Sequence, residues 1–143
     1  MSEQIRNISL KNETGYKTEI VSRNHLIISD EPAEKGGTDT GADPYELLLS
    51  SLGACKAITM RMYAERKNYP LKDIIINLSH KKIQAEDCID CQTKEGMIDK
   101  IEIDVSITGE LDDEQKKRLM MISDKCPVQK SLHSEIKIVT KAD

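Results

Sequence analysis

The sequence predicts an α+β fold, because strand-like and helix-like segments follow one another in blocks and not in regular alternation. Short strand-like segments come first and a long helix follows. Two long alternating strands, two shorter helices and a last strand complete the chain. The length of 143 residues suits a single domain, which we expect to span residues 1–143.

Six segments carry strand signals, which are alternating apolar and polar residues bounded by turn-forming residues. The alternation is clearest between Ile101 and Ile107, where every second residue is a β-branched aliphatic. The first three segments predict a meander, because short turns separate them. The six candidate strands are residues 7–11, 16–22, 25–29, 73–83, 99–108 and 134–141.

Three residues predict where the long helix starts. Asp43 is a suitable N-cap and Pro44 suits the first helical position. Glu46 then completes a start that resembles a capping box. We expect the helix to run to about Lys67, and the small residues in the range 50–54 allow another element to pack closely against it. The helix is therefore predicted to be central.

Two shorter helices are expected near the end of the chain. Acidic residues 112–114 predict the start of one, which runs to about Lys125. Pro127 predicts the first position of the other.

Composition and charge exclude several classes of protein. The net charge is −4, with basic and acidic residues interspersed, so no basic stripe for nucleic acid is expected. The longest aliphatic stretch, residues 47–49, is far too short to cross a bilayer. The N-terminus lacks the apolar stretch of a signal peptide, so we expect a cytoplasmic protein. Its four cysteines are then expected to be catalytic or metal-binding more often than structural.

The aromatic content also bears on assembly. The chain has four Tyr and no Phe or Trp, so aliphatic residues must supply a thin core. Burying surface against a second copy can supplement such a core, which makes a homodimer plausible.

Cys55 lies on the apolar stripe of the long helix. One interpretation is a small buried hydrophobic residue, whose thiol would be inert. The alternative is a reactive thiol. Because Cys55 lies about three turns from its helix N-terminus, such reactivity requires a cation from elsewhere, most naturally an arginine.

Cys126 directly precedes the predicted helix start at Pro127. Free backbone N–H groups at a helix N-terminus favour a thiolate. Lys125 and Lys130 add positive charge nearby. Local physical chemistry therefore predicts that Cys126 is the better-activated thiol.

Cys88 and Cys91 form a CxxC motif in an acidic connection between two strands. The motif is compatible with a structural pair, reduced or oxidised, with a redox pair, or with half of a zinc site. His80 is the nearest candidate for a third zinc ligand. The surrounding carboxylates disfavour thiolates at this position.

Four segments together resemble the OsmC/Ohr family, which comprises osmotically induced protein C and the organic hydroperoxide resistance proteins. They are residues 30–32, 36–37, 40–55 and 124–128. The most specific part is the Glu-Leu-Leu-Leu-x-x-Leu-Gly-x-Cys helix paired with a distant Cys-Pro-Val. The resemblance runs from about residue 15 to the end of the chain, and the segment 86–91 resembles a less characterised OsmC-like branch.

The resemblance implies an intertwined homodimer, in which antiparallel sheets wrap around a long central helix from each subunit. It also implies thiol-dependent reduction of organic hydroperoxides. Cys55 would attack the O–O bond and become a sulfenic acid, and Cys126 would resolve it to a disulfide that a dithiol reductant reopens. No metal or organic cofactor is implied.

The family further implies an arginine, held by a glutamate, beside the attacking thiolate. We assign Glu46 and Arg23 to these roles. In the family the glutamate lies ten residues before the cysteine, where this chain has Tyr45, and Glu46 lies nine before. One residue along a helix rotates a side chain by about 100°, so the arrangement in this chain is expected to differ.

Two alternatives stay open at this point. A non-catalytic homodimer on the same scaffold would bind a small molecule or sense redox state through its cysteines. A zinc-stabilised structural module would use Cys88 and Cys91.

Overall fold

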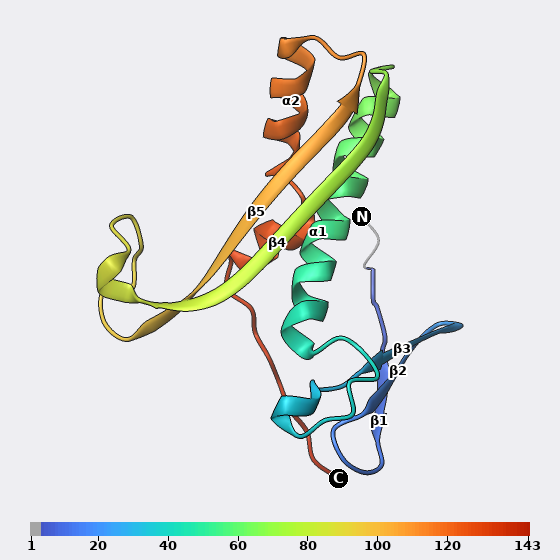
Figure 1. Cartoon of the computed structure of the whole chain (residues 1–143), viewed down its shortest axis with the longest axis vertical. Coiled ribbons are helices and arrows are strands. Elements are labelled where there is room, and N and C mark those ends of the chain that lie inside the picture. The colour runs from blue at the N-terminus through green and yellow to red at the C-terminus, as the bar shows by residue number, and fades with distance from the viewer. Residues whose placement is uncertain (1–3) are drawn as a thin grey trace. The chain divides into compact units, whose positions relative to one another are not determined.

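The structure is a computed structural model that describes residues 4–143, and its strands and helices form two compact units. The first unit ends at Leu48, and the second spans Leu49–Asp143. Antiparallel sheets together with helices confirm the α+β class (Figure 1). The elements are β1 (Ser9–Asn12), β2 (Thr18–Ser22), β3 (His25–Ser29), α1 (Pro44–Arg66), β4 (Leu71–Gln84), β5 (Met97–Gly109), α2 (Asp113–Ser123) and α3 (Pro127–Leu132).

The first unit contains the predicted meander. Strands β1, β2 and β3 pair antiparallel in that order, with Ile20 of β2 opposite Leu10 on one side and Ile27 on the other. Ile20 is the buried apolar residue of this sheet. The alternation in the sequence thus placed the strands correctly, with starts shifted by up to two residues.

The loop after β3 is organised around the buried carboxylate of Asp30. The Thr38 hydroxyl donates to Asp30 Oδ2 at 2.6 Å, and the Thr40 hydroxyl and backbone N–H donate to the same oxygen at 2.7 and 3.1 Å. The Glu31 N–H donates to Asp30 Oδ1 at 2.8 Å. These donors, the two hydroxyls first, hold the pKa of Asp30 far below its usual range.

Helix α1 begins with the predicted capping box. The Glu46 N–H donates to Asp43 Oδ1 at 2.8 Å, and the Asp43 N–H donates to Glu46 Oε1 at 2.9 Å. The helix ends at Arg66, where Asn68 takes a left-handed conformation with φ of 57°. Both ends therefore agree with the sequence prediction to within one residue.

In the second unit, β4 and β5 form a long antiparallel ribbon that runs beside α1, and its tip extends beyond the helix (Figure 1). A Cβ atom built on Gly53 would lie 2.8 Å from Leu78 Cδ1, so the missing side chain brings α1 close to β4. Arg61 fastens the start of β4, because its guanidinium donates to the carbonyls of Leu71 and Lys72 at 2.8 and 2.6 Å.

The core of the second unit gathers residues from α1, β4, α2 and the short connection that precedes α2. Its buried members are Met60, Tyr63, Ala64, Leu71, Leu111 and Leu119. Met60 and Leu119 are completely buried. This core joins α2 to α1, and so it positions the turn that follows α2.

The helices near the C-terminus start as predicted. Asp112 and Gln115 form a full capping box at α2, and Cys126 is the N-cap of α3 with Pro127 at its first position. Helix α2 ends at Ser123, two residues earlier than expected.

The predicted last strand at 134–141 is wrong for the single chain. Residues 135–143 have no regular secondary structure, and Ile136, Ile138 and Val139 are exposed. A strand needs the backbone groups of a neighbour, and this segment pairs with none of the strands described within residues 4–143. The alternating sequence of this segment is therefore not matched by a neighbouring strand within residues 4–143.

The helices of residues 4–143 include none with the length and apolar character that a bilayer crossing demands. The expectation of a single domain over residues 1–143 stays a prediction.

Candidate functional site

Cys55 and Cys126 lie together in the second unit. Cys55 projects from the middle of α1, and Cys126 lies at the start of α3, where the two thiols are close enough to interact. The Val128 N–H lies 3.5 Å from Cys55 Sγ, and the Gln129 N–H donates to Cys126 Sγ at 3.4 Å. Both sulfur atoms therefore face free N–H groups of the first turn of α3, which stabilise negative charge on sulfur.

The two thiols differ in exposure. Cys55 is partly exposed, whereas Cys126 is completely buried. Burial is the main cause that raises the pKa of Cys126, and the hydrogen bond with Cys55 raises it further. The Gln129 N–H and the charge of Lys56 act in the opposite direction. The helix start therefore does not lower the pKa of Cys126 as local physical chemistry predicts, because desolvation outweighs the donors there.

Lys56 is a buried cation beside this pair. Its side chain is only 3% exposed, and its Nζ donates to the Ser123 carbonyl at 3.1 Å and to Asp124 Oδ1 at 3.2 Å. Ser123 and Asp124 immediately precede the turn that carries Cys126. Lys56 thus ties α1 to the end of α2 and brings positive charge to Cys126.

Sequence reasoning missed Lys56 because it searched for an arginine from another element. A signal was present in the sequence, since Lys56 directly follows Cys55 in a helix predicted to be central. A lysine in such a helix requires a partner for its charge.

The two predicted supporting residues belong to the first unit. Glu46 takes part in the capping box of α1, and Arg23 occupies the turn between β2 and β3 with a left-handed φ of 55°. Their roles beside Cys55 stay predictions.

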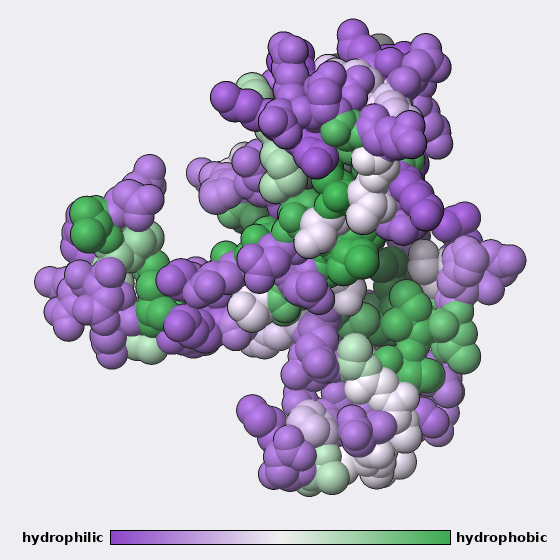
Figure 2. Space-filling model, turned by 45° about the horizontal axis from the view of Figure 1, so that its top comes forward, coloured by the Kyte–Doolittle hydropathy of each residue, from purple (hydrophilic) through white to green (hydrophobic). Residues whose placement is uncertain are grey.

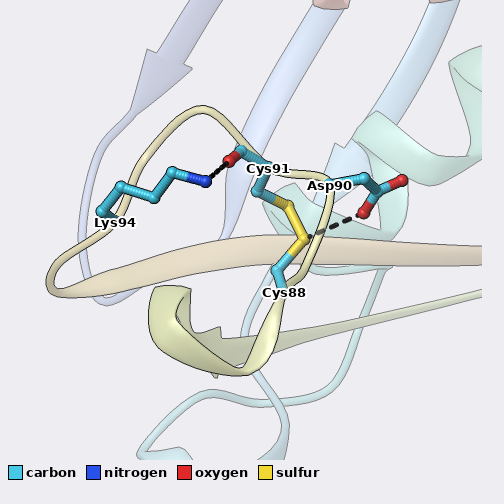
Figure 3. Close-up of a disulfide and its surroundings, with 4 residues drawn as sticks. All are labelled: Cys88, Asp90, Cys91 and Lys94. Atoms are coloured by element: carbon cyan, nitrogen blue, oxygen red, sulfur yellow. Dashed lines mark hydrogen bonds between the residues drawn. A yellow bond between two sulfur atoms is a disulfide. The ribbon is translucent and has the colours of Figure 1, made fainter.

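The remaining two cysteines lie at the tip of the β4–β5 ribbon. Cys88 and Cys91 form a disulfide, with Cα atoms 5.5 Å apart (Figure 3). Of the alternatives open from the sequence, the structure thus has the oxidised pair. His80 lies instead on β4, where its Nε2 is 2.8 Å from Asp99 Oδ1.

Comparison with known families identifies the chain. The model of the family described as OsmC-like protein matches residues 37–141, which is most of the chain. The chain therefore belongs to the OsmC-like protein family, as its motifs predicted. No curated protein sequence matches it.

Solved structures share the fold. An OsmC-like protein from Mycoplasma pneumoniae is 19% identical with a TM-score of 0.71, covering 92% of this chain and 89% of its own. The organic hydroperoxide resistance protein OsmC from Legionella pneumophila is 16% identical with a TM-score of 0.65, covering 92% and 91%. An organic hydroperoxide resistance protein from Elizabethkingia anophelis is 16% identical with a TM-score of 0.67, covering 95% and 93%.

Proposed function

We propose that the protein reduces organic hydroperoxides with electrons from a dithiol, using Cys55 to attack and Cys126 to resolve. The observation that carries the proposal is that Cys55 Sγ and Cys126 Sγ each accept from a backbone N–H group of the first turn of α3. Membership of the OsmC-like family and structural neighbours named for organic hydroperoxide resistance support the same chemistry. We place this thiol chemistry in the cytoplasm, where reduced cysteines persist.

The proposed reaction balances over three steps. The Cys55 thiolate attacks one peroxide oxygen, the O–O bond breaks, and the departing alkoxide takes up a proton to become an alcohol. The Cys126 thiol then attacks the sulfenic sulfur of Cys55, which forms a disulfide and releases water. A dithiol reduces this disulfide and is itself oxidised to a disulfide.

The difference between the two thiols suits these roles. Partial exposure lets a peroxide reach Cys55, while burial and a raised pKa make Cys126 the poorer first nucleophile. Lys56 supplies positive charge to the Cys126 side of the pair, whereas sequence reasoning expected an arginine beside Cys55.

We further propose that the active form is a homodimer. Ile58, Met62 and Ile75 are each more than half exposed on neighbouring parts of α1 and β4. They line an open cavity of about 620 Å³, and Figure 2 shows hydrophobic side chains reaching the surface among hydrophilic ones. A two-stranded ribbon is also marginally stable alone, so a second copy over this face would complete the layer.

A peroxide consumption assay tests the reaction. Cumene hydroperoxide and dithiothreitol are supplied to the wild type, Cys55→Ser and Cys126→Ser, with Ser131→Ala as an exposed control on α3. We expect turnover in the wild type and the control only. One equivalent of peroxide should also produce a Cys55–Cys126 cross-link in a peptide map under non-reducing conditions. No peroxide loss and no cross-link would instead support the non-catalytic binding or sensing homodimer.

Glu46 and Arg23 remain the proposed supporting pair, and two substitutions test them. Arg23→Ala should slow peroxide turnover while the cross-link still forms at high peroxide. Glu46→Gln should do the same without unwinding α1, because glutamine at this position also completes a capping box. Unchanged peroxide turnover in both variants would exclude Arg23 and Glu46 as supporting residues, and would leave Lys56 as the cation that supports the thiol chemistry.

A further inference from the structure

We propose that Cys88, Asp90 and Cys91 form a redox-gated binding site for a soft divalent metal ion, closed by the disulfide and opened by its reduction. The site lies at the tip of the β4–β5 ribbon, away from α1 (Figure 1). It therefore lies outside the Cys55–Cys126 chemistry, for which no metal is expected.

The three donor groups already converge. One ligand atom from each of Cys88, Asp90 and Cys91 lies within 4.8 Å of the other two, and Cys88 Sγ is 3.4 Å from Asp90 Oδ1 (Figure 3). Thiolate and carboxylate are both established zinc ligands. Two thiolates and a carboxylate from one turn would supply three of the four tetrahedral positions, with the fourth left to water.

The charge of the loop favours a bound cation. Between Ala85 and Gly96 the chain carries four carboxylates and one lysine, and Figure 2 shows the tip, at the left, as mostly hydrophilic. The lysine already has a backbone partner, since Lys94 Nζ donates to the Cys91 carbonyl at 2.7 Å. A divalent ion would reduce the repulsion among the carboxylates.

The β4–β5 ribbon does not depend on the disulfide for its stability. It joins cysteines only three positions apart, so it removes little freedom from the unfolded chain. The ladder beneath it is complete without it, because Gln84 pairs with Met97 and the Ala85 N–H donates to the Gly96 carbonyl at 2.7 Å. Ile89, between the two cysteines, is 97% exposed. Breaking the bond therefore leaves the ribbon intact.

The gating step balances as thiol–disulfide exchange. A dithiol gives two electrons and two protons to the Cys88–Cys91 bond, which becomes two thiols, while the dithiol becomes a disulfide. The metal ion then displaces both thiol protons and binds the two thiolates together with Asp90. In the reverse exchange, a disulfide oxidant accepts two electrons from the two thiolates and becomes a dithiol, which re-forms the Cys88–Cys91 bond and releases the ion.

Cobalt titration of the full-length protein tests the site, because Co²⁺ bound to thiolates absorbs light by charge transfer. The reduced wild type is expected to bind one equivalent per chain, which Zn²⁺ displaces, and the oxidised protein none. Cys88→Ser or Cys91→Ser should weaken binding by more than about 100-fold, and Asp90→Asn by roughly tenfold. Glu95→Gln, which removes one carboxylate of the same loop, is the matched control and should have little effect.

A parallel titration of Cys55→Ser distinguishes this site from the Cys55–Cys126 pair. The reduced variant should still bind one equivalent of Co²⁺ per chain. The proposal is overturned if the reduced wild type binds no metal, if the oxidised protein binds equally well, or if binding follows Cys55 instead of Cys88 and Cys91. Circular dichroism of each variant checks that the fold is kept. Failure of the peroxidase assay would leave this test unaffected.

Discussion

At the scale of single residues, Lys56 both contacts the end of α2 and brings charge to the thiol of Cys126. Its ammonium group lies between the carbonyl of Ser123 and the carboxylate of Asp124, so it holds α1 against the end of α2. Asp124 is largely exposed, and the pair therefore contributes little as a salt bridge by itself. Lys56 also brings positive charge to the buried thiol of Cys126, where it acts against the pKa increase that burial causes.

Replacing Lys56 by Met should raise the pKa of Cys126 further, because a cation that favours the thiolate is lost. The measurement is the pH dependence of thiolate absorbance in Cys55→Ser protein with Cys88 and Cys91 oxidised, which leaves Cys126 as the titrating thiol. Lys56→Arg keeps the charge and should restore the midpoint towards that of the parent. An unchanged midpoint in Lys56→Met would remove Lys56 from the mechanism.

At the scale of elements, the loop between β3 and α1 and the helix pair α1–α2 show two different ways of holding a segment in place. The loop depends on donors around the carboxylate of Asp30. The helix pair depends on apolar contacts around Met60 and Leu119. The first kind of stabilisation depends on pH, while the second responds to lost volume.

Asp30 should make folding sensitive to acid. Its pKa is depressed in the folded state, so its contribution is present above the ordinary aspartate value of 3.8 and is lost as the pH falls through the depressed folded value. Asp30→Asn should therefore lower stability at neutral pH and flatten its decline in acid, measured by urea unfolding across pH. Asp39→Asn is the control, because Asp39 is exposed with a left-handed φ of 53° that asparagine tolerates. A decline of unchanged steepness in Asp30→Asn would contradict this account.

Leu119→Ala should lower the free energy of unfolding by about 2–5 kcal/mol, since a fully buried side chain leaves a cavity between α2 and α1. It should also weaken the placement of Cys126 and slow formation of the Cys55–Cys126 cross-link. Ile89→Ala, at an exposed position, should change stability by less than about 0.5 kcal/mol. Equal losses in the two variants would show that the proposed core does not hold α2.

At the scale of the whole molecule, the second unit leaves apolar surface uncovered. Apart from the open face near Met62, the C-terminal segment carries exposed aliphatic residues and pairs with none of the strands in the described part of the chain, residues 4–143. Both features fit a chain that completes its layers with a second copy, as the proposed homodimer requires.

Met62→Glu should shift the protein from dimer to monomer, because a carboxylate would be buried at the proposed interface without a partner. Light scattering coupled to size exclusion measures the mass directly. Ile89→Glu places the same charge at the hairpin tip and should leave the dimer intact. A monomeric wild type, or a dimer that tolerates Met62→Glu, would contradict the proposed interface.

Much of the fold follows from local signals. The capping residues Asp43 and Asp112, and Pro127 in first helical position, set helix starts within a few residues, and strand alternation is equally local. The segment 134–141 marks the limit of such signals, because alternation predicts a strand but supplies no partner for it.

The sequence by itself determined the order of the elements as far as α3, the position of Cys126 before α3 and the family, since each depends on motifs that are readable within short stretches of the chain. Only the tertiary structure decided that Cys55 meets Cys126, that burial raises the pKa of Cys126, and that Lys56 is the buried cation beside them. Contact, desolvation and charge proximity arise from packing between segments far apart in sequence, which no local pattern records.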